Sequence, residues 1–137
     1  MADTLVLPRP DDFHAHFRSG ELAAAYAARH ALSFGRALAM PNTLPPIASA
    51  GAMLSYRDGL HRAAPDLEIL MTFKLLPGMG AKAVLACAAA GAAAGKYYPA
   101  GATTNAQDGV PSPSSVQAEL EAMEEAGLVL SIHGEDP

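Results

Sequence analysis

Short apolar runs alternate with helix-like segments along the whole chain. Runs that predict buried strands occupy residues 4–7, 36–40, 68–73, 92–98 and 128–133. Segments rich in helix formers lie between them, at residues 21–33, 49–62, 80–90 and 114–127. Strands and helices that alternate at these lengths predict a parallel sheet with right-handed crossovers. The pattern therefore indicates an α/β fold of about four β/α units and a fifth strand.

Capping residues mark the ends of the predicted helices. We expect Ser49 to cap the second helix, and SSVQ from Ser114 has the spacing of a capping box for the fourth. Gly91 and Gly127 stand where the third and fourth helices are expected to end. One face of the fourth helix is predicted to be apolar, formed by Val116, Leu120 and Met123.

Composition narrows the class of protein. The chain has 137 residues, of which 50% are hydrophobic and 17% charged, so it can bury a core of single-domain size. A net charge of −5 without a Lys/Arg cluster argues against nucleic acid as a partner.

No signal peptide and no apolar stretch of the ~20 residues that span a bilayer is evident, so no membrane association and a cytoplasmic location are predicted. The one cysteine, Cys87, cannot form an internal disulfide and is expected to pack in an alanine-rich helix.

Polar clusters follow four of the five predicted strands. They read PDDFHAHFR after the first strand, PNTLPP after the second, PAGATTNAQDG after the fourth and HGED after the fifth. Barrels and open sheets of the α/β class build their active sites at the carboxyl ends of parallel strands. These four clusters are therefore the predicted site.

A His-x-His pair stands in the first cluster. In an extended segment, residues two apart point to the same side, so His14 and His16 present both imidazoles to one point. Neutral imidazole suits zinc, and further ligands must come from elsewhere because two do not close a site. The spacing alone is also compatible with a hydrogen-bonded surface pair.

Two more candidate residues end later strands. Lys96 closes an apolar strand, where a charged ammonium is costly unless it is paired or neutralised. A side chain whose ammonium reaches solvent at the strand end is the alternative. His133 ends the fifth strand and is ambiguous alone, but three histidines and a lysine at strand ends together favour a functional cluster.

Four ordered motifs give the chain a family resemblance. RPDDFHAHFRSG, MPNTLPP, KYYPAGATTNAQDGV and HGED closely resemble the N-terminal part of bacterial single-function dihydroorotases of the amidohydrolase superfamily. The resemblance covers essentially the whole chain. It implies that residues 1–137 are the N-terminal portion of a single (β/α)8 barrel domain, a TIM barrel that carries two zinc ions at its C-terminal mouth.

The resemblance assigns four metal ligands. His14 and His16 match the pair on the first metal, and His133 matches a ligand of the second. Lys96 matches a lysine that carbon dioxide converts to a bridging carbamate, which is a carboxylated lysine. Cobalt or manganese are possible substitutes for zinc with the same ligands.

The resemblance also assigns substrate contacts. Arg18 and Asn42 match residues that hold the substrate carboxylate, a role suited to a planar guanidinium. Thr103 and Thr104 match a pair on a mobile loop that closes over the substrate. The residues alone are equally compatible with other roles. Asn42 is then a turn residue, Thr103 and Thr104 are ordinary polar residues of a loop, and Arg18 is a solvent-exposed charge.

The implied activity is that of a dihydroorotase. A binuclear metal-bound hydroxide opens dihydroorotate to N-carbamoyl-L-aspartate, and the reverse closure serves de novo pyrimidine biosynthesis. The implied partners are these small molecules, and a homodimer is expected when the protein is complete. Phe13, Ser19 and Gly101 depart from the tryptophan, aspartate and asparagine that many relatives are expected to carry.

The length of the chain limits the expected activity. A full barrel takes about 250 residues and eight strands. The resemblance places the second histidine of the second metal and the aspartate that acts as general base beyond Pro137. We therefore expect a truncated barrel with open sheet edges, inactive on its own.

Three other functions remain open on the sequence. The chain is alternatively another cyclic-amide hydrolase acting on hydantoins or dihydropyrimidines, a non-catalytic scaffold that associates with aspartate carbamoyltransferase, or an inert fragment. The MPNTLPP and KYYPAGATTN motifs favour dihydroorotate over other rings. Intact candidate ligands count against a scaffold.

Overall fold

A computed structural model describes residues 4–135 of the chain. The strands are β1 (Asp11–Ala15), β2 (Arg36–Ala39), β3 (Glu68–Lys74), β4 (Ala92–Tyr97) and β5 (Val129–Ile132). The helices are α1 (Glu21–His30), α2 (Ala50–Ala63), α3 (Ala81–Ala89), the short 3₁₀ helix η1 (Pro113–Val116) and α4 (Gln117–Glu125). The predicted order of four β/α units and a fifth strand is confirmed.

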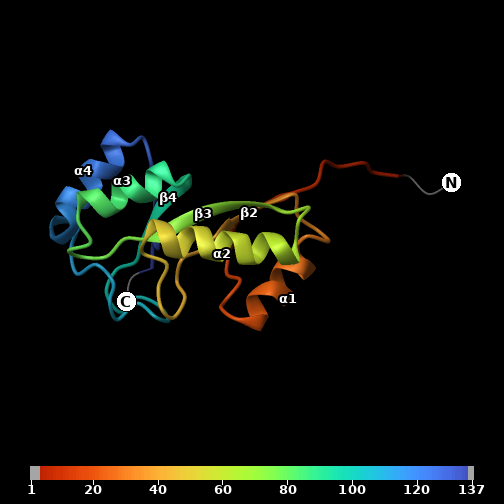
Figure 1. Cartoon of the computed structure of the whole chain (residues 1–137), viewed down its shortest axis with the longest axis horizontal. Helices are drawn as coiled ribbons and strands as arrows, with labels where there is room; N and C mark the ends of the chain where they lie inside the picture. Colours follow the sequence, from red (N-terminus) through yellow and green to blue (C-terminus); the bar gives the residue numbers. More distant parts are fainter. Residues whose placement is uncertain (1–3, 136–137) are drawn as a thin grey trace.

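The five strands form one parallel sheet in the order β1-β2-β3-β4-β5. Strands adjacent in sequence are adjacent in the sheet, so right-handed crossovers place their helices on one face. The helices pack on one another in the same order, α1 on α2, α2 on α3 and α3 on α4 (Figure 1). This strand order is the one predicted for the N-terminal part of a (β/α)8 barrel.

Small and medium apolar side chains fill the space between the sheet and the helices. Met53 and Leu60 of α2 and Val84 and Cys87 of α3 are fully buried there. Burial raises the pKa of the Cys87 thiol to about 11, which keeps it protonated in its packing role. Gly95 of β4 is closely packed, because a Cβ there would lie 2.7 Å from the Met123 side chain and 2.9 Å from that of Phe73.

The predicted first strand at residues 4–7 is wrong. Residues 4–10 form no strand, Leu5, Val6 and Leu7 are exposed, and this segment runs away from the body of the molecule (Figure 1). The first strand is instead DDFHA, which pairs with β2 through Asp11 to Arg36 and Asp12 to Ala37. An apolar run resembles a buried strand, but pairing partners decide which segment joins the sheet.

The predicted helix ends are confirmed except at the start of the fourth helix. Ser49 caps α2, accepting a hydrogen bond from the Ala52 N–H at 3.3 Å, and Gly91 and Gly127 follow α3 and α4 with positive φ. The capping box at Ser114 is wrong, because residues 113–116 form η1 and α4 begins at Gln117 without a side-chain cap. The fourth helix still buries Val116 and Met123, with Leu120 packed against the core.

The edge strands expose apolar side chains. Phe13 of β1 is 56% exposed, and Val129 and Ile132 of β5 are 63% and 58% exposed. No helix within the described residues is both long and apolar enough to cross a membrane.

Candidate active site

The His-x-His pair lies at the carboxyl end of β1. His14 belongs to the strand and His16 follows it, and their ring centroids are 5.2 Å apart, so both imidazoles share one side. Burial lowers the pKa of His14, and the positive charge of Lys96 lowers it further. Burial likewise lowers the pKa of His16, followed by the charges of His14 and Arg18. Both rings are therefore biased toward the neutral form that binds metals.

Lys96 lies on β4 with only 1% of its surface exposed. Its Nζ donates to Ser131 Oγ at 3.3 Å and to the Ile132 carbonyl at 3.4 Å, both long hydrogen bonds. Within the described residues it has no carboxylate partner. Burial lowers the pKa of Lys96, which favours the neutral, nucleophilic amine. The alternative of an ammonium that reaches solvent does not fit this burial.

His133 follows β5 and lies beside Tyr98. The two ring centroids are 5.8 Å apart, and the same Tyr98 ring lies 5.6 Å from Lys96 Nζ. The His133 Nε2 is 2.7 Å from Glu135 Oε2, an acid two residues along the HGED motif. His133 is close enough for its charge to act on His14 and His16. All four predicted metal residues therefore gather at the carboxyl edge of the sheet.

Arg18 lies near this cluster in a strained backbone conformation. Its φ is 67°, a left-handed value that costs a non-glycine residue ~1–2 kcal/mol. The Tyr56 hydroxyl of α2 donates to the Arg18 carbonyl at 2.6 Å. Burial raises the pKa of Tyr56 to about 12, so the hydroxyl keeps its proton at neutral pH. Tyr56 thus holds the turn that carries Arg18.

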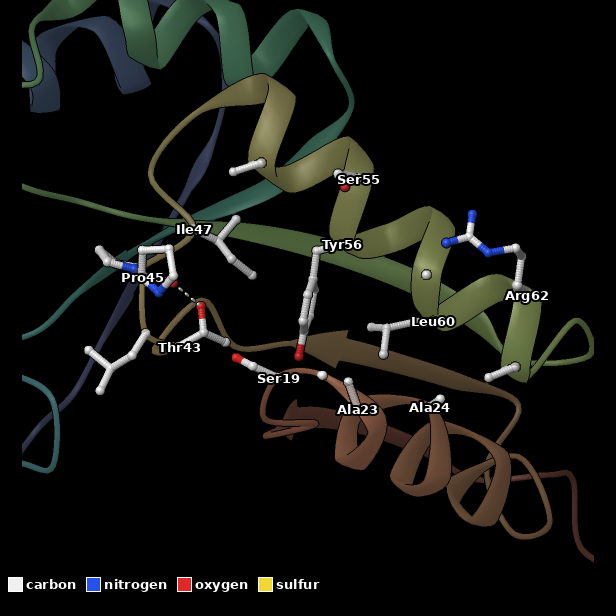
Figure 2. Close-up of a pocket in the computed structure, with 16 residues that line it drawn as sticks. Ser19, Ala23, Ala24, Thr43, Pro45, Ile47, Ser55, Tyr56, Leu60 and Arg62 are labelled. Carbon is white, nitrogen blue, oxygen red and sulfur yellow. Dashed lines mark hydrogen bonds between the residues drawn. The ribbon is translucent and has the colours of Figure 1, made fainter.

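A groove of about 710 Å³ lies between α1 and α2, away from the histidines. Figure 2 shows Tyr56 reaching across it from α2 toward Ser19. None of the predicted metal ligands lines this groove, so it is separate from the strand-end cluster.

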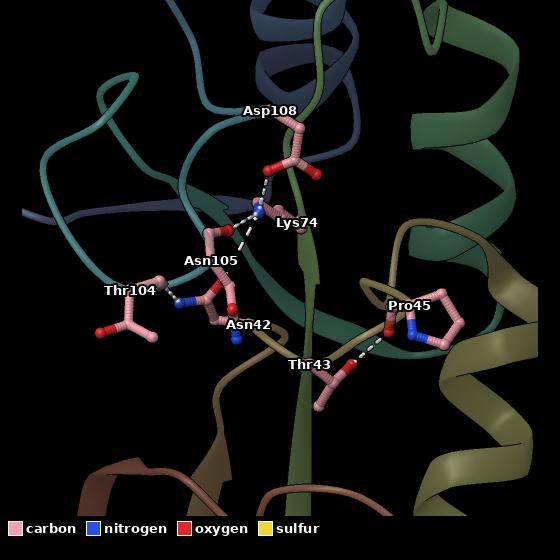
Figure 3. Close-up of polar contacts among 7 residues, drawn as sticks. All are labelled: Asn42, Thr43, Pro45, Lys74, Thr104, Asn105 and Asp108. Carbon is pink, nitrogen blue, oxygen red and sulfur yellow. Dashed lines mark hydrogen bonds and ion pairs between the residues drawn. The ribbon is translucent and has the colours of Figure 1, made fainter.

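Asn42 and the threonine loop form a second cluster at the same edge (Figure 3). The Asn42 Nδ2 donates to the Thr104 carbonyl at 2.6 Å. Thr103 is partly buried and Thr104 is exposed. Asn42 therefore touches the predicted substrate loop directly.

Sequence reasoning missed two residues here, Lys74 and Tyr98. Lys74 ends the apolar strand β3 and is 1% exposed, so it carries the same signal that singled out Lys96. Tyr98 is 1% exposed, and its hydroxyl has no hydrogen-bond partner within the described residues. Its ring lies 5.6 Å from Lys74 Nζ and equally far from Lys96 Nζ. An aromatic residue after an apolar strand gives no comparable sequence signal.

The described side chains supply few donors for a metal ion. Among residues 4–135, no three His, Cys, Asp or Glu side chains come close enough to hold a metal ion. The described residues offer two adjacent imidazoles, a third nearby and a buried amine without oxygen atoms. These side chains alone do not complete a metal site, and the roles of the individual site residues stay predictions.

Curated proteins named Dihydroorotase match the chain over nearly its whole length. One from Marinobacter nauticus is 41% identical over 137 residues, and the match covers 98% of this chain and 40% of that protein. One from Leptothrix cholodnii is 44% identical over 138 residues, with the same coverage of both. The chain therefore spans about 40% of the length of these relatives. No family model matches the chain.

Solved structures agree with the sequence comparison. Dihydroorotase from Saccharomyces cerevisiae, in complex with 5-fluoroorotic acid, superposes with a TM-score of 0.86 at 32% identity, covering 93% of this chain and 36% of that one. Dihydroorotase from Campylobacter jejuni gives a TM-score of 0.84 at 30% identity, covering 93% and 38%. L-Hydantoinase from Arthrobacter aurescens, at 19% identity and a TM-score of 0.71 over 92% of this chain and 29% of that one, shares the fold.

Proposed function

Because the chain is related to dihydroorotases over nearly its whole length, we propose that it is the metal-binding and substrate-binding part of a dihydroorotase. The activity is the reversible hydrolysis of dihydroorotate to N-carbamoyl-L-aspartate, a step of pyrimidine biosynthesis. The observation that supports it most directly is the position of Lys96. It is buried without a carboxylate partner among the described residues, and it lies near the paired imidazoles of His14 and His16.

Carboxylation of Lys96 supplies the oxygen donors that the described side chains lack. The neutral amine attacks carbon dioxide, a C–N bond forms and the nitrogen loses a proton, which leaves a carbamate with two oxygens. Carboxylation also keeps Lys96 from existing as a buried ammonium without an acidic partner. The lowered pKa of Lys96 favours this reaction because only the neutral amine is nucleophilic.

Two zinc ions are the proposed cofactors, with cobalt or manganese as substitutes. His14, His16, His133 and the Lys96 carbamate are the proposed ligands in this chain. When bound, the metal pair supplies Lewis-acid activation of water and of the ring carbonyl.

The remaining side chains bind and orient the ring. Arg18 and Asn42 hold the substrate carboxylate, which fixes the ring for attack. The Thr103 and Thr104 loop excludes water when the substrate is bound. Asn42 links these two tasks, because its amide already bonds the Thr104 carbonyl.

Further sequence is needed for turnover. The relatives are more than twice as long as this chain, and the resemblance assigns the general-base aspartate and another histidine to residues outside it. We therefore expect residues 1–137 alone to be inactive. A homodimer and a cytoplasmic location of the complete protein remain predictions.

A ring-opening assay on the complete gene product tests this function. Dihydroorotate and hydantoin are offered in parallel, with metal content measured in the wild type and in His14→Ala. Turnover of dihydroorotate well above hydantoin, and loss of both metal and turnover in the variant, are expected. Preference for hydantoin would favour the other hydrolase class, and a wild type without bound metal or turnover would favour a scaffold.

A further inference from the structure

Lys74 is a second buried lysine at the carboxyl edge of the sheet, and it is fully hydrogen-bonded. Its Nζ donates to Asp108 Oδ1 at 2.5 Å, to the Asn105 carbonyl at 2.7 Å and to Asn42 Oδ1 at 3.4 Å (Figure 3). A lysine ammonium has three protons to donate, and here each has an acceptor. The side chain of Lys74 is 1% exposed and that of Asp108 is 46% exposed. The ammonium is therefore buried, whereas its carboxylate partner remains in contact with solvent.

Two of these acceptors belong to the loop of residues 99–110, which carries Thr103 and Thr104. The loop is closed at its base, where the Val110 N–H donates to the Tyr98 carbonyl at 2.8 Å. Gly109 permits this closure, because a Cβ there would lie 2.7 Å from the same Tyr98 carbonyl. Beyond the base, Lys74 reaches the loop from β3 and binds it at Asn105 and Asp108.

The third acceptor fixes the orientation of Asn42. An ammonium only donates, so it takes the Oδ1 atom of the Asn42 amide and leaves the Nδ2 atom facing the loop. That Nδ2 donates to the Thr104 carbonyl at 2.6 Å. Lys74 therefore contacts two segments at once: the segment between β2 and α2, at Asn42, and the 99–110 loop, at Asn105.

We propose that Lys74 is a positioning residue that ties the 99–110 loop to Asn42 and so sets Thr103, Thr104 and the Asn42 amide for substrate binding. The role in substrate binding rests on the proposed function, whereas the tie between loop and sheet stands on the hydrogen bonds alone. Lys74 acts through Asn42 and the loop and is not assigned a contact with substrate.

Lys74→Met in the complete gene product tests this role, with Lys82→Met as the matched control. Methionine keeps the length and apolar character of the side chain without the three donors, and Lys82 is exposed on α3. We expect amide hydrogen exchange in residues 100–108 to accelerate by ~10-fold, because hydrogen bonds to a charged group are lost. We expect KM for dihydroorotate to rise by ~10-fold while kcat changes less than ~3-fold. Lys82→Met should leave both unchanged.

Asp108→Asn keeps the test decisive if Lys74→Met does not fold. Its side chain is 46% exposed, and asparagine retains an acceptor while removing the charge, so the fold should survive. A smaller acceleration of loop exchange, by ~3-fold, is expected.

Three results would overturn the inference. Unchanged loop exchange in both variants would remove the tie between Lys74 and the loop. Equal acceleration throughout the sheet would make Lys74 a general stabilising residue, and faster loop exchange with unchanged KM would remove its role in binding. If the wild type does not turn over dihydroorotate, the proposed function fails, but loop exchange still decides whether Lys74 holds the loop.

Discussion

Two buried lysines lie side by side at the carboxyl ends of neighbouring strands and differ in their hydrogen-bond partners. Lys74 on β3 and Lys96 on β4 pair in register, each is 1% exposed, and each Nζ lies 5.6 Å from the Tyr98 ring. Lys74 has Asp108 at 2.5 Å and two further acceptors. Among residues 4–135, the hydrogen-bond partners of Lys96 are Ser131 Oγ at 3.3 Å and the Ile132 carbonyl at 3.4 Å.

The difference shows that burial alone does not decide what a lysine does. Asp108, in the loop that follows β4, forms an ion pair with Lys74, whereas no described carboxylate pairs with Lys96. An ion-paired ammonium is a structural tie, whereas an unpaired buried amine is free to react. The same residue type at the same depth therefore serves as an anchor on one strand and as the proposed carbamate on the next.

Removal of the reactive lysine should have the largest effect. We expect Lys96→Met in the complete gene product to lower kcat/KM by more than ~10³-fold, because the oxygen donors that the proposed carbamate would supply are lost. Metal content should fall in parallel, whereas Lys74→Met should keep its metal. Short carboxylic acids with added metal should partly restore Lys96→Ala, where a cavity admits them. A variant at Lys96 with normal metal content and normal rates would show that the two lysines do not differ as proposed.

Giving Lys96 an acidic partner should make it resemble Lys74. In Ser131→Asp a carboxylate replaces the Oγ atom that lies 3.3 Å from Lys96 Nζ. A nearby negative charge stabilises the ammonium and raises the pKa of Lys96, so less neutral amine is present to react with carbon dioxide at neutral pH. We expect kcat/KM to fall by ~10–100-fold.

Ser131→Asn is the control, because it has the shape of aspartate without the charge. The rates of both variants are measured at rising bicarbonate concentration. Partial recovery of Ser131→Asp with bicarbonate is expected, and equal rates in the two variants would mean that charge at this position does not govern Lys96.

The sequence predicts the class of fold and singles out Lys96, one of the two buried lysines. Strands β2 to β5 and the four helices lie within a few residues of their predicted bounds, because apolar periodicity and glycine stops are local signals. The first strand was misplaced because TLVL is more apolar than DDFHA, and only pairing with β2 identifies the true strand. Lys96 was found because it ends an apolar run.

The partners of Lys74 were beyond reach of the sequence. Asp108 lies 34 residues from it and Asn42 lies 32 residues away, and neither spacing follows from local pattern. The tie between Tyr56 and Arg18, 38 residues apart, was missed for the same reason. Residue types therefore indicated the chemistry, and the fold supplied the contacts that separate an anchor from a reactive group.

A substitution that disturbs the pairing of β3 with β4 should destabilise the two strands that carry Lys74 and Lys96. Gly95 precedes Lys96 and pairs with Phe73, which precedes Lys74. In Gly95→Ala the new Cβ would lie 2.7 Å from the Met123 side chain and 2.9 Å from that of Phe73, so these side chains or β4 must shift. We expect the free energy of unfolding to fall by ~1–3 kcal/mol, measured by urea denaturation.

Gly51→Ala is the matched control for this substitution. Gly51 lies in α2, and a Cβ there would meet nothing within 4 Å, so the free energy of unfolding should rise by ~0.5–1 kcal/mol. Stability of Gly95→Ala equal to that of the wild type would mean that β4 has room to spare beside Lys96.

The smallest effect is expected at Tyr56. Its hydroxyl contacts Arg18, which is proposed to bind substrate together with Asn42. Tyr56→Phe removes the 2.6 Å hydrogen bond to the Arg18 carbonyl, worth ~1 kcal/mol, and leaves the ring in place. Since φ of Arg18 is 67°, the turn should relax and KM for dihydroorotate should rise by ~5-fold with little change in kcat.

Tyr26→Phe on α1 is the control for Tyr56→Phe, because Tyr26 is 44% exposed. The raised pKa of Tyr56, about 12, means that its hydroxyl remains a donor at every pH below ~11, so the KM difference between wild type and Tyr56→Phe should be constant from pH 6 to ~9. A difference that disappears within that range, or a fall in kcat without a rise in KM, would show that Tyr56 does not act by positioning Arg18. In that case positioning from a distance would be confined to Lys74 and its loop.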